Sequence, residues 1–228
     1  MSPSRSTSLP SPLPRRARSD AARQTRGDAI LAAASELLAG ATFEAVTVAA
    51  VAARAGVAKG SVFNYFATKE ALGLALAERE YASFYDSLDR ALGQARAPLS
   101  VGRLASIFTL ALDEHPAFVR LIPIVGPVLE PNVGESEARR YKSALLARMT
   151  ATGAVIEKAF RGFRPGDGLQ FLRFVEVMVA GLSLLAEPAP AVARALAAEE
   201  LAPLRVDFAR DFTNALHHYL TGAVRLQG

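Results

Sequence analysis

The chain has 228 residues, no cysteine and a formal net charge of +4. The absence of cysteine excludes disulfides, cysteine-ligated zinc and thiol redox sensing, and the length allows a second domain beside a small helical one. No apolar run is long enough to cross a bilayer, since the longest, residues 174–186, is interrupted by Glu176. We therefore expect a cytoplasmic protein without a membrane partner.

Residues 1–22 consist mainly of serine, proline and arginine and predict a disordered basic tail. No apolar core follows the basic start, as it would in a secretory signal. The first 72 residues hold nine basic and five acidic residues, which accounts for the whole net charge. A basic arm of this kind can contact the phosphates or the minor groove of DNA, or it can serve only to keep the chain soluble. Both interpretations stay open.

Residues 23–40 predict the first helix. Its apolar side chains recur at helical spacing and form one buried stripe, made of Ile30, Ala33, Ala34, Leu37 and Leu38. Gly40 is suited to end the helix. Phe43 and Val46 follow in the connection, and we expect them to close a unit of three helices.

Residues 47–65, TVAAVAARAGVAKGSVFNY, predict two short helices over 47–55 and 59–65 with a tight turn between them. Thr47 is a suitable N-cap for the first helix, because its hydroxyl can accept an orphan amide. Gly56 stands where that helix must stop, at a position that favours the left-handed backbone conformation. So short a turn lets two helices cross steeply, so the pattern is a helix-turn-helix.

A helix presented in this way can enter the major groove of DNA with its N-terminal half. Tyr65 and Lys69 follow where a hydroxyl and an ammonium can meet phosphate oxygens. The groove-facing residues are expected to be Lys59, Gly60, Ser61, Phe63 and Asn64.

The segment AGVAKGSVFNYFATKEAL, preceded by TVAAVAA, resembles the signature of TetR-family transcriptional regulators. The resemblance covers residues 23 to about 76 and departs from the family at Ala58, where a capping serine or threonine is usual, and at Phe63, where tyrosine is common. It implies an all-α fold with a helix-turn-helix domain and a C-terminal domain for ligand binding and dimerisation. The DNA contacts that it implies are Thr25, Thr47, Lys59, Ser61, Phe63, Asn64, Tyr65 and Lys69.

Residues 68–93 predict a long helix that begins in the DNA-binding unit and ends in the second domain, with Thr68 as its N-cap. We place the domains at 1–22 (tail), 23–67 (helix-turn-helix) and 68–228 (ligand binding and dimerisation). The stretch 123–134 is too broken by proline and glycine for a long helix, and no strand pattern is visible. Further helices are expected at 99–115, 116–122, 135–163, 168–187 and 204–220.

The apolar content of these helices predicts two uses. The first is a homodimer, because two half-sites on DNA require two recognition helices. The family resemblance implies that the last two long helices of each subunit form the interface. Their expected faces are Phe171, Phe174, Val175, Met178 and Leu182 on one helix and Phe208, Phe212, Ala215, Leu216 and Tyr219 on the other.

The second use is a pocket for a small apolar ligand. Polar groups that can orient the ligand are His115, Arg120 and Glu176. The alternative is that the aromatic and methionine side chains simply fill the core. The candidate wall consists of Tyr81, Phe84, Tyr85, Phe108, Leu112, Phe118, Leu121, Ile122, Met149 and Met178.

Catalytic and metal sites are not indicated. The chain has no Gly-x-Ser-x-Gly, no His-Glu-x-x-His and no phosphate-binding glycine loop, and the adjacent His217 and His218 point about 100° apart on a helix. We expect no enzyme and no cofactor. The sequence predicts a homodimeric repressor that binds a palindromic operator on double-stranded DNA and is released by a small apolar ligand. The alternative is an architectural or partner-binding DNA protein of the same fold without a ligand.

Overall fold

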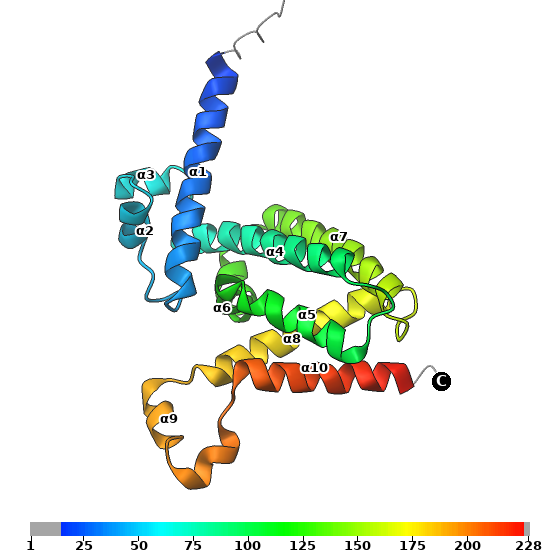
Figure 1. Ribbon diagram of the computed structural model, residues 1–228. Helices are drawn as coiled ribbons and strands as arrows, with labels where there is room; N and C mark the ends of the chain where they lie inside the picture. Colours follow the sequence, from blue (N-terminus) through cyan, green and yellow to red (C-terminus); the bar gives the residue numbers. More distant parts are fainter. Residues whose placement is uncertain (1–14, 226–228) are drawn as a thin grey trace, which may run out of the picture.

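The computed structural model describes the backbone of residues 15–225 and the side chains of residues 22–225, and every regular element in that range is helical (Figure 1). The predicted all-α class is confirmed. The first helix, α1 (Arg15–Ala39), begins well before the predicted start at Arg23. Residues 15–22 are therefore helical and the prediction of disorder is wrong there, because the arginines and alanines of this stretch are good helix formers. The same prediction for residues 1–14 lies outside the described residues.

Helices α2 (Val48–Arg54) and α3 (Lys59–Phe63) cross beside α1 and complete an N-terminal unit (Figure 1). The predicted N-cap is confirmed, since Thr47 Oγ1 accepts from the Ala50 amide at 3.1 Å. Gly56 has a φ of 68°, which confirms the left-handed turn between the two helices. Val51 and Val62 are buried with Ile30 in the core of this unit. The turn at Gly56 and the packing of these three side chains thus fix the orientation of α3 relative to α1.

Helix α4 (Lys69–Gln94) runs from this unit into the rest of the molecule, as predicted (Figure 1). Thr68 caps it by accepting from the Ala71 amide at 3.0 Å. Near its start, Gly73 lies where the connection after α1 meets the C-terminal part. A Cβ at Gly73 would be 2.9 Å from the ring of Phe43 and 2.8 Å from Leu129 Cδ2. The joint between the two parts is therefore closely packed around a residue without a side chain.

The C-terminal body is built on α4 by helices that pack around one core. These are α5 (Val101–Asp113), α6 (Pro116–Ile124), α7 (Glu135–Ala159), α8 (Asp167–Ala186) and α10 (Phe208–Arg225). The chain between α6 and α7 forms a π-helical turn, Val125–Leu129, and a 3-10 turn, Glu130–Asn132, so it contains no long helix, as predicted. Helices α7 and α8 cross at Gly153 and Gly168, where a Cβ on either glycine would overlap the backbone of the other helix.

A short excursion that the sequence did not predict separates α8 from α10. It holds α9 (Pro190–Ala195) and a 3-10 turn, Glu199–Leu204, and Figure 1 shows α9 standing apart from the other helices. Arg205 closes the excursion on itself by donating to the carbonyls of Leu196, Ala197 and Ala198 at 2.6 to 2.9 Å. Helix α10 consequently begins at Phe208 rather than at the predicted Leu204.

Helix α8 buries one face and exposes the other. Among the described helices it alone is long and apolar enough to cross a membrane, a property that the sequence analysis missed by considering only residues 174–186. Phe171 and Val175 are buried in the body, where α8 packs on α6, α7 and α10. A core helix of a globular protein passes the same test of length and composition, so this property is weak evidence for a membrane span.

The predicted dimer faces are partly wrong. Phe171 and Val175 of α8 and Phe212 and Leu216 of α10 are buried within the subunit and face its own core. Their helical periodicity was correct, but it does not say whether an apolar face meets a partner or the same chain. The exposed apolar side chains of α8 are Phe174, Val177, Leu184 and Leu185, and their spacing places them along one face.

Candidate functional site

Helix α3 is anchored on one side and exposed on the other. Val62 is buried against the N-terminal unit, while Lys59, Gly60 and Asn64 are exposed. Phe63 exposes 44% of its surface, although large apolar side chains are usually buried. The residues predicted to face the groove of DNA therefore share an accessible surface, apart from Ser61, which is half-buried.

A polar hollow of about 440 Å³ lies between α1 and α3 and is lined by Arg23, Arg26, Ser61, Asn64 and Tyr65, together with residues 56–58. Arg23 Nη2 donates to the Asn64 carbonyl at 3.3 Å, and its guanidinium lies 5.6 Å from the centre of the Tyr65 ring. Two arginines beside the exposed face of α3 make this hollow suitable for a phosphate group. Arg23 and Arg26 were not among the predicted DNA contacts, although their positive charge on the first helix is visible in the sequence.

The other predicted contacts lie around this surface. Thr25 is exposed on α1 between the two arginines. The Thr47 hydroxyl caps α2. Lys69 Nζ donates to the Glu44 carbonyl at 3.2 Å and lies 4.6 Å from the centre of the Phe43 ring, so its ammonium already has partners within the chain. Their contact with DNA stays a prediction.

Some of the predicted ligand residues are buried in the core, and others line hollows. Phe84 and Phe118 stack with ring centres 4.2 Å apart in the core. His115 is also engaged there, because its Nδ1 lies 2.8 Å from the Ala111 carbonyl and its Nε2 lies 3.3 Å from Ser83 Oγ. Five candidates line hollows, namely Tyr81, Ile122, Leu112, Arg120 and Glu176. The other eight are not among the residues that line these hollows: Phe84, Tyr85, Phe108, His115, Phe118, Leu121, Met149 and Met178.

Tyr81 and Ile122 line a hollow of about 440 Å³, which we call the Glu176 hollow. Its walls come from α4, from α6 and the turns that follow it, and from the helices α7 and α8. Tyr85 Oη donates to Glu176 Oε1 at 3.4 Å. Burial raises the pKa of Glu176 to about 7, against the lowering effects of Lys142, of this hydrogen bond and of Arg173. The carboxyl group therefore exchanges its proton near neutral pH.

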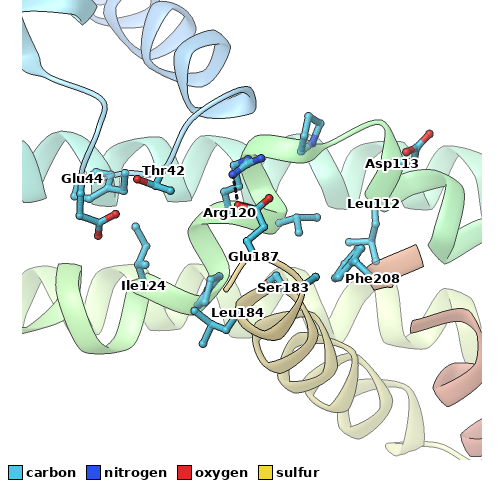
Figure 2. Close-up of a pocket in the computed structure, with 15 residues that line it drawn as sticks. Thr42, Glu44, Leu112, Asp113, Arg120, Ile124, Ser183, Leu184, Glu187 and Phe208 are labelled. Atoms are coloured by element: carbon cyan, nitrogen blue, oxygen red, sulfur yellow. Dashed lines mark hydrogen bonds and ion pairs between the residues drawn. The ribbon is translucent and has the colours of Figure 1, made fainter. Parts of the chain in front are cut away.

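A second hollow of about 380 Å³, the interdomain groove, separates the N-terminal unit from the C-terminal body. Figure 2 shows Thr42 and Glu44 of the connection after α1 on one side, and residues of α6 and α8 on the other. Arg120 Nη1 donates to Glu187 Oε2 at 2.6 Å and so joins α6 to the end of α8 (Figure 2). Leu112 also lines this groove, so the predicted ligand residues are divided between two hollows.

His217 and His218 are exposed on α10. The His218 Nδ1 atom lies 2.7 Å from the Asn214 carbonyl within the same helix. Within the described part of the chain, no group of three or more histidine, aspartate or glutamate side chains could hold a metal ion.

Two family models match the chain. Residues 30–76 match bacterial regulatory proteins of the tetR family, and residues 78–225 match a tetracyclin repressor-like C-terminal domain. The matches divide the chain within α4, the helix that joins the N-terminal unit to the body. No curated protein matches the sequence.

Solved structures share the fold. A tetR-family transcriptional regulator from Streptomyces coelicolor has a TM-score of 0.53 and 17% identity, over 89% of this chain and 82% of that one. A TetR transcriptional regulator from Legionella pneumophila has the same score and identity, over 85% and 94% of the two chains. The reduced form of NemR from Escherichia coli has a TM-score of 0.53 and 19% identity, over 84% and 95%. At sequence identities of 17 to 19%, the similarity to these structures shows a shared fold and nothing more.

Proposed function

The chain belongs to the TetR family of bacterial regulatory proteins, and from this premise we propose that it is a homodimeric repressor that leaves a palindromic operator when a small ligand occupies the C-terminal body. The observation that carries the proposal is the exposure of Lys59, Gly60, Phe63 and Asn64 on a helix held from behind by Val62. A short helix presented in this way can place its side chains on base edges in the major groove. We propose no catalytic activity.

Phosphate contacts supply the second part of operator binding. Arg23 and Arg26 line the hollow beside α3, and a guanidinium group can bind a phosphate through two parallel hydrogen bonds. They would fix the position of α3 on the duplex, while Lys59 and Asn64 would read bases. The predicted contact from Lys69 would require its ammonium to leave the Glu44 carbonyl, so we give the arginines the larger share.

Dimerisation would use the exposed apolar face of α8. Val177, Leu184 and Leu185 each expose 59 to 67% of their surface, and Phe174 exposes 42%. A row of such side chains on one helix is typical of a protein interface. A two-fold dimer through this face would present two copies of α3, as a palindromic operator requires.

Release from DNA would act through the joint between the two parts. Gly73 on α4 contacts both Phe43 and Leu129, and the Arg120–Glu187 ion pair crosses the body beside the interdomain groove. A ligand that binds better to an arrangement with wrongly spaced recognition helices favours release by that difference in affinity. The close packing at Gly73 means that a shift of α4 displaces the N-terminal unit with it.

DNA binding is tested with the purified protein and the duplex that flanks its own coding region, in a salt series. We expect operator affinity to fall about tenfold or more in Lys59→Ala and in Asn64→Ala, because each loses a base contact. Lys158→Ala is the matched control, since Lys158 is exposed near the end of α7, far along the chain from the N-terminal unit. Unchanged affinity in both test variants, or equal affinity for every duplex, would contradict sequence-specific binding through α3.

The dimer is tested by analytical ultracentrifugation. We expect Val177→Arg to sediment as a monomer, because two desolvated charges would face each other across the two-fold axis. Leu110→Arg is the control, because Leu110 is an exposed apolar side chain on α5, outside the α8 face. A Val177→Arg protein that remains dimeric would rule out this face as the interface.

A further inference from the structure

Glu176 is a carboxylate without a charged partner at short range. Within residues 22–225, no ion pair within 4.0 Å engages it, and its hydrogen bond from Tyr85 is long at 3.4 Å. It is held on α8 at the wall of a hollow of about 440 Å³, which is large enough for a small organic molecule. The Glu176 side chain is half-buried, and removing a charge from water is costly unless the charge is paired. The missing partner would lie in the hollow.

Aromatic rings surround this carboxylate. Tyr81 and Tyr141 line the hollow at nearly right angles, with ring centres 6.4 Å apart, and Tyr85 lies behind them. The Tyr141 hydroxyl is buried and makes no hydrogen bond of acceptable geometry with any other group in residues 22–225. Burial raises the pKa of all three tyrosines, so they are neutral at physiological pH. The rings of Tyr81 and Tyr141 can therefore face a cation in the hollow, and their hydroxyls can donate to or accept from a polar group.

Two basic residues line the hollow, Lys142 and Arg173. Lys142 Nζ lies 2.5 Å from Glu130 Oε1, so its charge already has a partner. Within residues 22–225 no ion pair within 4.0 Å engages Arg173, but it is exposed on α8, where water screens its charge. An anionic ligand would thus meet the Glu176 carboxylate, one cation that is already paired and one whose attraction is weakened by solvent.

Apolar side chains supply the rest of the wall. Ile122, Val125, Leu145 and Val177 line the same hollow, and Phe174 lies among them. This surface suits a hydrocarbon or aromatic body about as long as two or three fused rings, since pockets of this size bury most of a small ligand. A ligand that fits the whole hollow is therefore apolar over most of its length and carries its charge at one end.

We propose that the Glu176 hollow binds organic cations with an apolar body, such as aryl-alkyl amines, with the Glu176 carboxylate as the counter-charge and the tyrosine rings around the cation. The inference rests on the proposed function, because it names the class of the releasing ligand. It narrows the ligand from any apolar molecule to one with a positive charge.

The test uses three probes that differ only in the end group: 4-phenylbutylamine, 4-phenylbutan-1-ol and 4-phenylbutyrate. Their binding to the full chain is measured without DNA by isothermal titration calorimetry at pH 8, where Glu176, with a pKa of about 7, carries its charge. We expect the amine to bind about tenfold or more tightly than the alcohol, as a charge-assisted hydrogen bond in a partly desolvated site provides. The butyrate should bind most weakly of the three.

Substitutions of Glu176 test whether its carboxylate causes the preference for the amine over the alcohol. Glu176→Gln should bind the amine and the alcohol equally, and Glu176→Asp should keep a preference for the amine. Glu187→Gln is the matched control, because it removes a carboxylate from the end of the same helix, in the other hollow. The comparison of the three probes in the wild-type protein is independent of whether any variant folds.

Three results would overturn the inference: no measurable binding of the amine at millimolar concentration, equal binding of amine and alcohol, or a preference for the amine that persists in Glu176→Gln. Operator binding is measured separately and distinguishes this inference from the proposed function. If the protein binds its operator but not the amine, only the ligand class is wrong. If the amine binds through Glu176 but the operator is never bound or never released, the inference stands and the proposed repressor mechanism fails.

Discussion

The half-buried carboxylate of Glu176 on α8 predicts that Glu176→Gln stabilises the protein, and that it does so more at high pH than at low pH. In the folded chain burial raises the pKa of Glu176 to about 7, from an ordinary value of 4.5. The folded state therefore holds a proton that the unfolded state has released, so the free energy of unfolding falls as pH rises from about 4.5 to about 7 and is level above. The difference between these two pKa values lowers the free energy of unfolding by about 3 kcal/mol at most, because one pKa unit corresponds to about 1.4 kcal/mol. Residual exposure of the carboxylate to water makes the effect smaller.

The assay is urea denaturation of the wild-type protein and of Glu176→Gln at one protein concentration, followed by circular dichroism at pH 5, 6, 7 and 8. We expect the stability advantage of Glu176→Gln to grow by about 2 kcal/mol between pH 5 and pH 8. Glu187→Gln is the control for the loss of a carboxylate from α8, because its side chain is 53% exposed and paired with Arg120 at the surface. An advantage that is the same at pH 5 and pH 8, or that shrinks with rising pH, would refute the reasoning from burial.

Three further predictions follow from helix packing, capping and charge. Gly168→Ala should lower the free energy of unfolding by about 1 to 3 kcal/mol, because its Cβ would overlap the Gly153 carbonyl. The control is Gly93→Ala, whose Cβ meets open space and should not lower that free energy in the same denaturation assay. Equal effects of the two substitutions would contradict the close crossing of α7 and α8. Thr47→Ala should cost about 1 kcal/mol through loss of the cap on α2, measured as a lower urea midpoint, and an unchanged midpoint would show that water replaces the hydroxyl. Arg26→Ala should weaken binding to every duplex alike, and the slope of log affinity against log salt concentration should fall by about the share of one phosphate contact. A loss of affinity confined to the operator would instead assign Arg26 to base recognition.

The helix-turn-helix could be predicted because its determinants are local. The cap at Thr47, the left-handed turn at Gly56 and the buried Val62 lie within sixteen residues, and each acts through its immediate neighbours. The start of α1 was predicted less well. Residues 15–22 share their arginines with the proline-rich stretch before them, so composition assigned them to a tail, while their helix propensity continues α1.

The ligand residues show the limit of periodicity. Phe84, Phe118 and Tyr81 were all visible as apolar positions on helices, but only Tyr81 lines the Glu176 hollow, while the two phenylalanines stack against each other. A helical repeat identifies the face that leaves water, and it carries no information on whether the space beyond is filled. The same reason explains why two of the five predicted dimer residues on α8, Phe171 and Val175, are buried in the subunit.

The sequence by itself determined the family, the all-helical class and the helix-turn-helix, because these depend on short-range backbone preferences and on a run of contiguous residues. Only the tertiary structure decided where the carboxylate of Glu176 lies. Tyr81, Glu130, Tyr141 and Glu176 come from four separate elements, and they share one hollow only because α4, α7 and α8 pack around a common core. The electrostatic cost of that carboxylate depends on how much water the packed helices exclude, and this exclusion exists only once the chain has folded.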